Sequence, residues 1–135
     1  MAGSSTVTKS DITVNGRITR KVLTIAWTGA AAGGAIDAIT INPVTYGLEG
    51  WFLYSVETNP GTTAPTDNYD IAITDADGFD IAGGLLADRD QTNTEMVNLR
   101  VAAAGYPMVR GNLSVAITNN SVNSATGTII LAFVK

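Results

Sequence analysis

The stretch RITRKVLTIAWT, residues 17–28, holds the pattern that decides the fold. Leu23, Ile25 and Trp27 fall on one face of an extended chain, opposite three smaller residues. Because successive side chains of a β-strand point to opposite faces, a period of two predicts a strand. The second half of this strand is apolar enough on both faces to be mostly buried.

The same period recurs along the chain in short runs separated by Gly, Pro and Asn, whereas helical periodicity is nearly absent. All four prolines lie outside the runs, and Asp77-Gly78 is placed to turn the chain back through residues 79–82. Residues 85–96 are the one stretch that could hold a helical turn, and their sequence fits a long loop equally well. The expected strands are residues 6–14, 17–28, 35–42, 51–56, 69–75, 97–103, 113–119 and 125–135.

About eight short strands with connections of uneven length predict an all-β fold, a two-sheet antiparallel sandwich. Jelly-roll and immunoglobulin-like arrangements are both open, and the strand count favours a jelly-roll-like one. A length of 135 residues corresponds to one domain. We expect residues 11–135 to form that domain, and residues 1–10 (MAGSSTVTKS) to be an extended N-terminal arm, flexible or ordered by a partner.

Two runs are apolar on both faces: residues 51–56 (WFLYSV) and 129–134 (IILAFV). Both faces of each strand must therefore be shielded from water, and the core of a sandwich shields only one of them. The second cover is either a loop of the same chain, which we favour, or a neighbouring subunit.

Composition excludes several chemistries. The chain has no His and no Cys, which removes Ser-His-Asp triads, cysteine nucleophiles, imidazole or thiolate zinc sites and disulfides. Only 15% of residues are charged, against roughly a quarter in soluble domains. A surface so poor in charge is easily desolvated against a partner.

Charge and hydropathy also indicate which classes of partner the chain does not bind. A net charge of −4 with eight Lys and Arg residues disfavours nucleic acid as a partner. No apolar run approaches the roughly 20 residues that span a bilayer, and the N-terminus lacks the apolar segment of a secretory signal. We therefore expect no nucleic-acid or membrane partner, and no cofactor.

Acidic residues gather between residues 66 and 81. Asp75, Asp77 and Asp80 resemble part of a calcium loop, since oxygens on alternating residues can converge on a hard cation. The glutamate and flanking helix of an EF-hand are missing. A β-hairpin turn with Asp77-Gly78 at its tip is therefore favoured, and these three residues stay weak metal candidates.

Carboxylates near Trp51 and Arg89 permit one enzyme hypothesis. Glycoside hydrolysis needs two flanking carboxylates, and Asp88, Asp90 and Glu49 are candidates. The spacing is unspecific, so we expect no enzymatic activity.

A carbohydrate- or receptor-binding module is a further alternative, built on Trp51, Tyr54 and the Asp-rich loop. Strand alternation separates Trp51 from Tyr54, which favours a core role for these rings.

Four of the eight basic residues lie between residues 9 and 21. Arg17, Thr19 and Lys21 share one strand face, which indicates either a strand end in solvent or a docking strip for an acidic surface. With the acidic loop near Asp75, it also permits head-to-tail contact between copies. The candidate partner-contact residues are Ser4, Thr6, Lys9, Arg17 and Lys21.

Three segments carry a family resemblance: residues 63–89 (TAPTDNYDIAITDADGFDIAGGLLADR), 94–97 (TEMV) and 111–135 (GNLSVAITNNSVNSATGTIILAFVK). A Pro-Thr-Asp turn precedes a Tyr-Asp strand, an Asp-x-Asp-Gly hairpin follows, and the chain ends in a Thr-Asn strand, an Asn/Ser/Gly turn and an apolar strand. This pattern resembles small structural proteins encoded among the virion genes of tailed bacteriophages.

The resemblance implies a virion component, and for a protein of this size a head decoration or cement protein. Such proteins are commonly β-rich and sit on the capsid exterior as small oligomers that bridge capsid subunits. The implied partners are further copies of this chain, as a homotrimer, and the major capsid protein. The implied location is the virion, after synthesis in the host cytoplasm. A tail or neck component is the alternative.

Overall fold

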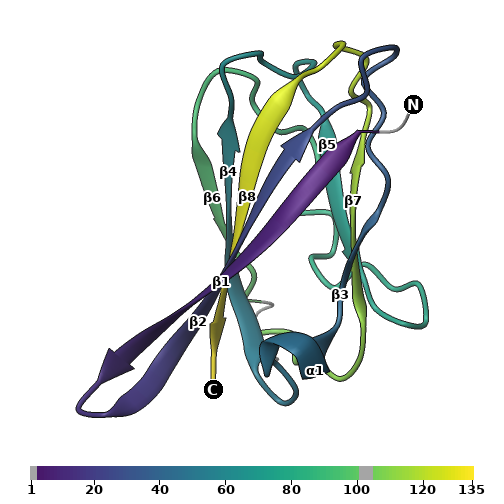
Figure 1. Ribbon diagram of the computed structural model, residues 1–135. Coiled ribbons are helices and arrows are strands. Elements are labelled where there is room, and N and C mark those ends of the chain that lie inside the picture. Colours follow the sequence, from purple (N-terminus) through teal and green to yellow (C-terminus); the bar gives the residue numbers. More distant parts are fainter. Residues whose placement is uncertain (1–2, 101–104) are drawn as a thin grey trace.

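The computed structural model describes residues 3–100 and 105–135, which form eight strands and one four-residue helix. The strands lie in two antiparallel sheets that face each other (Figure 1). The elements are β1 (Ser4–Val14), β2 (Arg17–Thr28), β3 (Ile39–Ile41), α1 (Pro43–Tyr46), β4 (Phe52–Pro60), β5 (Asp70–Thr74), β6 (Glu95–Asn98), β7 (Leu113–Thr118) and β8 (Thr126–Val134).

The topology is that of a jelly-roll-like sandwich, as predicted. One sheet has five strands in the order β1-β2-β8-β4-β6, and the other has three in the order β3-β7-β5. From β2 onward each successive strand lies in the opposite sheet, so the chain wraps around the core and β8 returns to pair with β2. Every ladder is antiparallel.

The predicted strands differ from the observed ones mainly at their ends. Residues 17–28 form β2 as expected, while the expected strand at 35–42 shortens to β3. Asn42 caps a short helix there, and Pro43 begins it, as its fixed φ permits. Pro60 is the last residue of β4, so the expectation that every proline lies outside the strands is wrong at this position.

Of the two possibilities for residues 85–96, the structure shows the loop, which holds turns and ends in the first residues of β6. Two further expectations differ. The return strand expected at 79–82 is reduced to one bridge, between Thr74 and Asp80. The strand expected at 97–103 is β6, two residues earlier, and positions 101–104 lie outside the described residues.

The core lies between the sheets. Leu23, Ile25 and Trp27 of β2 point into it, as their alternation predicts, and Trp27 packs against the Tyr69 ring with centroids 6.0 Å apart. Burying side chains of this size stabilises the fold by roughly 1.5–3 kcal/mol each. Further fully buried large side chains include Phe133, Ile41, Leu48, Leu53, Ile73, Leu86, Leu99, Leu113, Ile129 and Leu131.

The two runs that are apolar on both faces are covered unequally. In β8, Ile129, Leu131 and Phe133 are fully buried, whereas Ile130 and Val134 on the opposite face are half-buried. In β4, Leu53 and Val56 are buried while Phe52 and Tyr54 are half-buried. The outer face of the five-stranded sheet therefore keeps part of its apolar surface accessible.

The segment expected as a free N-terminal arm is paired within the chain. Ser4 to Ser10 form the first part of β1, and their partners run from Thr28 back to Val22 of β2. The physical reason is that β2 pairs with β8 along one edge and leaves its other edge open, and the eleven residues of β1 are long enough to pair along that open edge. Whether this segment also orders against a partner stays a prediction.

Gly127 tests the packing between β2 and β8. A Cβ atom at Gly127 would lie 2.5 Å from the Trp27 ring, and that ring is buried. Overpacking of a core typically costs about 1–3 kcal/mol, and we expect Gly127→Ala to lower the free energy of unfolding by that amount in urea denaturation. Gly111→Ala is the matched control, since nothing lies within 4 Å of its added Cβ. Equal midpoints for the two variants would contradict this account.

Candidate functional site

The most prominent surface feature is the hairpin formed by β1 and β2. Its outer half extends beyond the body of the sandwich (Figure 1). Asn15 and Gly16 connect the strands with φ values of 51° and 76°, the left-handed pair that a tight type I′ turn requires. Val14 pairs with Arg17 across this turn. We call residues 11–20 the hairpin tip.

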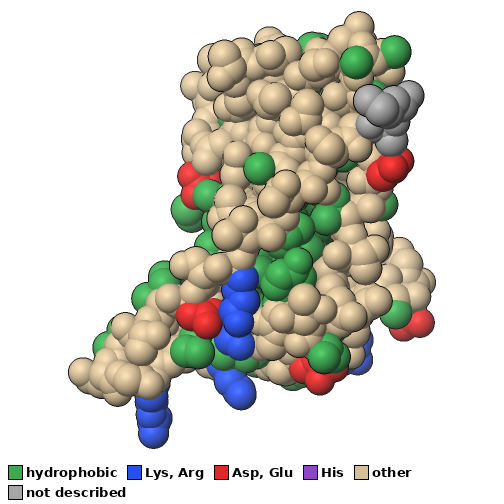
Figure 2. Space-filling model, viewed as in Figure 1, with side chains coloured by type: hydrophobic (Ala, Val, Ile, Leu, Met, Phe, Trp, Pro, Cys, Tyr) green, Lys and Arg blue, Asp and Glu red, His purple; other side chains and the backbone are tan. Residues whose placement is uncertain are grey.

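The hairpin tip exposes aliphatic side chains. Ile12, Val14 and Ile18 are 48%, 53% and 45% exposed. Hydrophobic and basic side chains lie together along the projecting hairpin (Figure 2). Exposed aliphatic residues on a projecting two-stranded ribbon leave apolar area that a partner surface can bury.

The docking strip predicted from the sequence includes Arg17 and Thr19 of this tip, but the projecting hairpin itself was not predicted. The signal was present, because Asn15-Gly16 between ITV and RI is a strong hairpin pattern.

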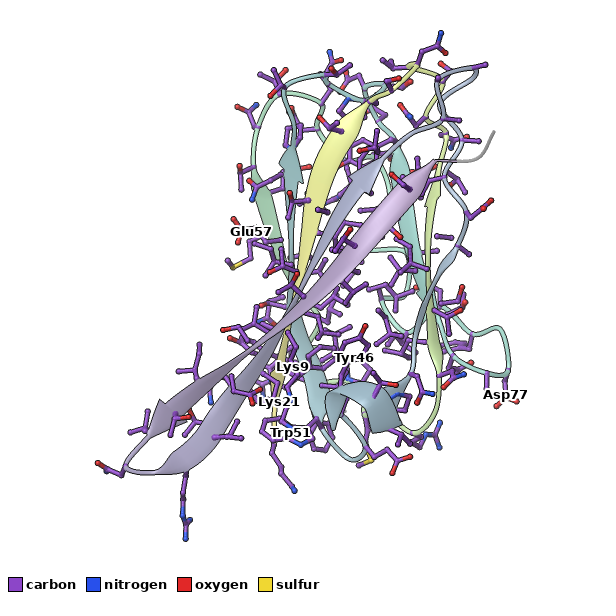
Figure 3. All side chains as sticks on the ribbon, in the orientation of Figure 1. Lys9, Lys21, Tyr46, Trp51, Glu57 and Asp77 are labelled. Carbon is purple, nitrogen blue, oxygen red and sulfur yellow. The ribbon has the colours of Figure 1, made fainter. Side chains whose placement is uncertain are left out.

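The base of the hairpin is anchored to the body by Lys21. Its Nζ donates a hydrogen bond of 2.6 Å to the Gly47 carbonyl and lies 4.7 Å from the centroid of the Trp51 ring. Burial, reinforced by the nearby Lys9, lowers the pKa of Lys21 below its ordinary value, and Asp11 acts in the opposite direction. Figure 3 shows Lys21 and Trp51 close together beneath the hairpin.

A second basic contact fixes the hairpin where it leaves the sheet. The Arg20 guanidinium lies 5.6 Å from the centroid of the Tyr54 ring, and Tyr54 in turn packs edge-on against Tyr106. Arg20 Nη1 also donates to the Thr19 carbonyl over 2.9 Å. These contacts hold the hairpin as an extension of the five-stranded sheet.

The predicted contact residues divide into two groups. Ser4, Thr6, Lys9 and Arg17 are exposed, and Lys9 pairs with Asp11 over 3.6 Å. Lys21 is buried and bonded within the chain, so it does not lie on the same accessible strip as Arg17. A contact role for the four exposed residues stays a prediction.

β1 is also the longest sheet edge. The edge strands are β1 and β6 in one sheet and β3 and β5 in the other. β1 has eleven residues, whereas β3 and β6 have three and four. The outer edge of β5 bonds to the segment that follows it, for example through Ile71 N to the Leu86 carbonyl and Arg89 N to the Tyr69 carbonyl.

The Asp-rich loop is a turn whose carboxylates accept backbone hydrogen bonds. Asp75 Oδ1 accepts from the N–H groups of Asp77 and Phe79, each over 3.0 Å. Asp80 accepts from Ala82 and Gly84 over 3.0 and 2.9 Å. Within the described residues no group of three or more His, Cys, Asp or Glu side chains is placed to hold a metal ion. The geometry matches the favoured turn, with Gly78 at a φ of 82°.

The loop forms one wall of an apolar groove. The groove has a volume of about 690 Å³, within the range of protein ligand pockets. Phe79 and Met108 on its walls are 66% and 45% exposed. Asp75, Asp77 and Arg110 supply its charges; the other lining residues are Ala76, Ile81, Gly105, Tyr106, Pro107, Gly111 and Leu113. Sequence analysis missed this groove because its two walls lie about thirty positions apart in the chain.

Of the carboxylates considered for hydrolysis, Glu49 and Asp88 are exposed. Trp51 is only 6% exposed, and its ring lies under the ammonium groups of Lys21 and Lys135, so it is not open to stack on a sugar. Hydrogen bonds from the backbone N–H groups of Asn93 and Thr92 hold the pKa of Asp90 below its ordinary value, the opposite of what a general acid needs.

Arg89 has a structural role. Its guanidinium donates to the Ala87 and Leu85 carbonyls and lies 3.7 Å from Glu95.

The solved structures that are similar to this chain include the following two. A chain of the cyanophage Pam1 capsid asymmetric unit aligns over 98% of this chain and 86% of its own length, with 16% identity and a TM-score of 0.45. The CBM22-1 xylan-binding domain of Paenibacillus barcinonensis Xyn10C aligns over 99% and 86%, with 11% identity and a TM-score of 0.38. Both scores indicate only a general similarity of shape. No protein-family model and no curated protein sequence matches the chain.

Among residues 3–100 and 105–135, no helix has the length and apolar content needed to cross a bilayer.

The different placements of Lys21 and Arg17 give a stability prediction. Lys21→Met keeps most of the aliphatic stem but removes the bond to Gly47. Since hydrogen bonds of charged groups contribute about 1.5–3 kcal/mol, we expect the variant to unfold at lower urea concentration. Arg17→Met, at an exposed position, should stay within about 0.5 kcal/mol of the parent. A larger loss at Arg17 than at Lys21 would contradict the described anchor.

Proposed function

We propose that this chain is an assembling structural protein of a tailed-phage particle, and that it acts as a capsid decoration protein. In this role it binds the exterior of the assembled head and stabilises it through contacts between several subunits. The observation that carries the proposal is the projecting β1–β2 hairpin with its exposed apolar tip.

The edge strand supports an assembly role. Natural sheets protect long edges with charges, prolines or a covering segment, because open backbone groups pair with other chains. β1 reads SSTVTKSDITV, with no proline and one lysine, and that lysine is paired with Asp11. An edge left this accessible fits a strand that meets a neighbouring subunit, by added strand pairing or by side-chain contact.

The chemistry of the surface fits the same role. A chain with 15% charged residues loses little hydration energy when another protein covers it. The resemblance of residues 63–89 and 111–135 to phage structural proteins supports a virion as the setting. Many copies that bind only the assembled lattice stabilise it by mass action, since each bound copy lowers the free energy of the assembled state.

We propose no catalytic role, and a homotrimer as the leading oligomer. A tail or neck location is compatible with the same surfaces. The second candidate function is carbohydrate binding, which the groove favours because Phe79 and Tyr106 line it and aromatic rings stack on sugars. A glycan array, run with and without calcium, tests this candidate, and the absence of binding in both conditions removes it.

Binding to capsids tests the leading proposal. The purified chain should co-sediment with phage heads that lack it and raise the temperature at which these heads release their DNA. A variant with Val14→Asp and Ile18→Asp should lose most of this stabilisation, because two charges would have to be buried in the contact.

Val44→Asp is the matched control, since Val44 is 73% exposed on α1 and outside the hairpin. The proposal fails for a chain that ignores capsids and leaves their stability unchanged. It also fails if the control and the hairpin variant lose the same stabilisation.

A further inference from the structure

We infer that the hairpin tip of one copy docks into the apolar groove of a second copy, in a head-to-tail contact. The inference rests on the proposed assembly role and names the partner of the hairpin. It starts from the distribution of exposed apolar side chains. Among the described residues eight large hydrophobic side chains are exposed, and five of them lie on two features: Ile12, Val14 and Ile18 on the tip, and Phe79 and Met108 in the groove.

The two surfaces differ in shape in a complementary way. The tip is a two-stranded ribbon that stands clear of the body (Figures 1 and 2). The groove is a hollow of about 690 Å³ between the Asp-rich loop and residues 105–113, large enough for several aliphatic side chains. A convex apolar element and a concave apolar element complement each other in shape, whereas two grooves leave a void between them.

The charges of the two surfaces are also complementary. The tip carries Arg17 and Arg20 against Asp11, one excess positive charge. The groove carries Asp75 and Asp77 against Arg110, one excess negative charge. Charges of this kind set the orientation of docking more than its strength. They favour a tip in a groove over contacts between like surfaces.

The contact must join different molecules. Asp77, on the wall of the groove, lies on the opposite side of the molecule from the hairpin (Figures 1 and 3). Lys21 and Arg20 hold the base of the hairpin against Gly47, Trp51 and Tyr54, on the side away from the groove. As far as the described residues show, each copy therefore offers one tip and one groove to its neighbours, and such contacts close into a ring when the rotation between copies permits.

Cysteine cross-linking tests this contact directly, because the chain contains no Cys of its own. Two single variants, Val14→Cys and Phe79→Cys, are purified separately, mixed and oxidised. Docking holds the two thiols at a high local concentration, so the mixed dimer should form at least about tenfold faster than either self-linked dimer. The control replaces Phe79→Cys with Val44→Cys, which is equally accessible but outside the groove.

A complementation experiment checks the polarity of the contact. Val14→Asp with Ile18→Asp disables the tip, and Phe79→Asp disables the groove. Neither variant should self-associate in sedimentation velocity, but a mixture should form one heterodimer and nothing larger, since only one intact tip and one intact groove remain. Cross-linking no faster than the Val44→Cys control, together with no heterodimer, overturns the inference.

The inference and the proposed function fail separately. Capsid binding without cross-linking would retain the decoration role and remove the head-to-tail contact. Cross-linking by a chain that ignores capsids would retain the contact and remove the role.

Discussion

The packing of the Trp27 ring on Gly127 is the constraint on which the rest of the structure depends. Trp27 and Gly127 are directly paired across β2 and β8, and the ring fills the space that a Cβ atom would need. A one-residue slip of this ladder would turn Leu23, Ile25 and Trp27 out of the core. Because β8 also pairs with β4, and β1 takes its register from β2, this single contact helps to fix the order of the whole five-stranded sheet.

The hairpin is held rigidly because its strands continue into that sheet. β2 is buried at one end and exposed at the other, so one continuous strand connects the core to the projecting tip. Lys21 lies where the two environments meet, with its ammonium group held by Gly47 and Trp51. A tip held in this way loses little conformational freedom on docking, and preorganisation of this kind favours association. The same stiffness keeps the tip away from the groove of its own chain.

The structure shows where the few charged side chains of the chain lie and what they contact. Several of these charged side chains are used internally or lie at the two candidate contact surfaces. Arg89 and Lys21 bond within the chain, and Asp75 and Asp80 hold the turn beside the groove. The accessible surface also includes the small, largely neutral side chains of β1 and the apolar residues of tip and groove. A surface of this composition suits contact between proteins better than recognition of a charged ligand.

The sequence by itself determined the fold class, the position of most strands and the turn at Asp77-Gly78, because these depend on local periodicity and on backbone preferences of neighbouring residues. It also proposed Ser4, Thr6, Lys9, Arg17 and Lys21 as partner-contact residues, and the structure places the first four at exposed positions. Only the tertiary structure decided that residues 4–10 pair within the chain, that Lys21 is buried, and that Phe79 and Met108 share a groove. Each of these depends on which distant segments the strand order brings together. Periodicity tells which face of a strand is apolar, but not which surface will cover it.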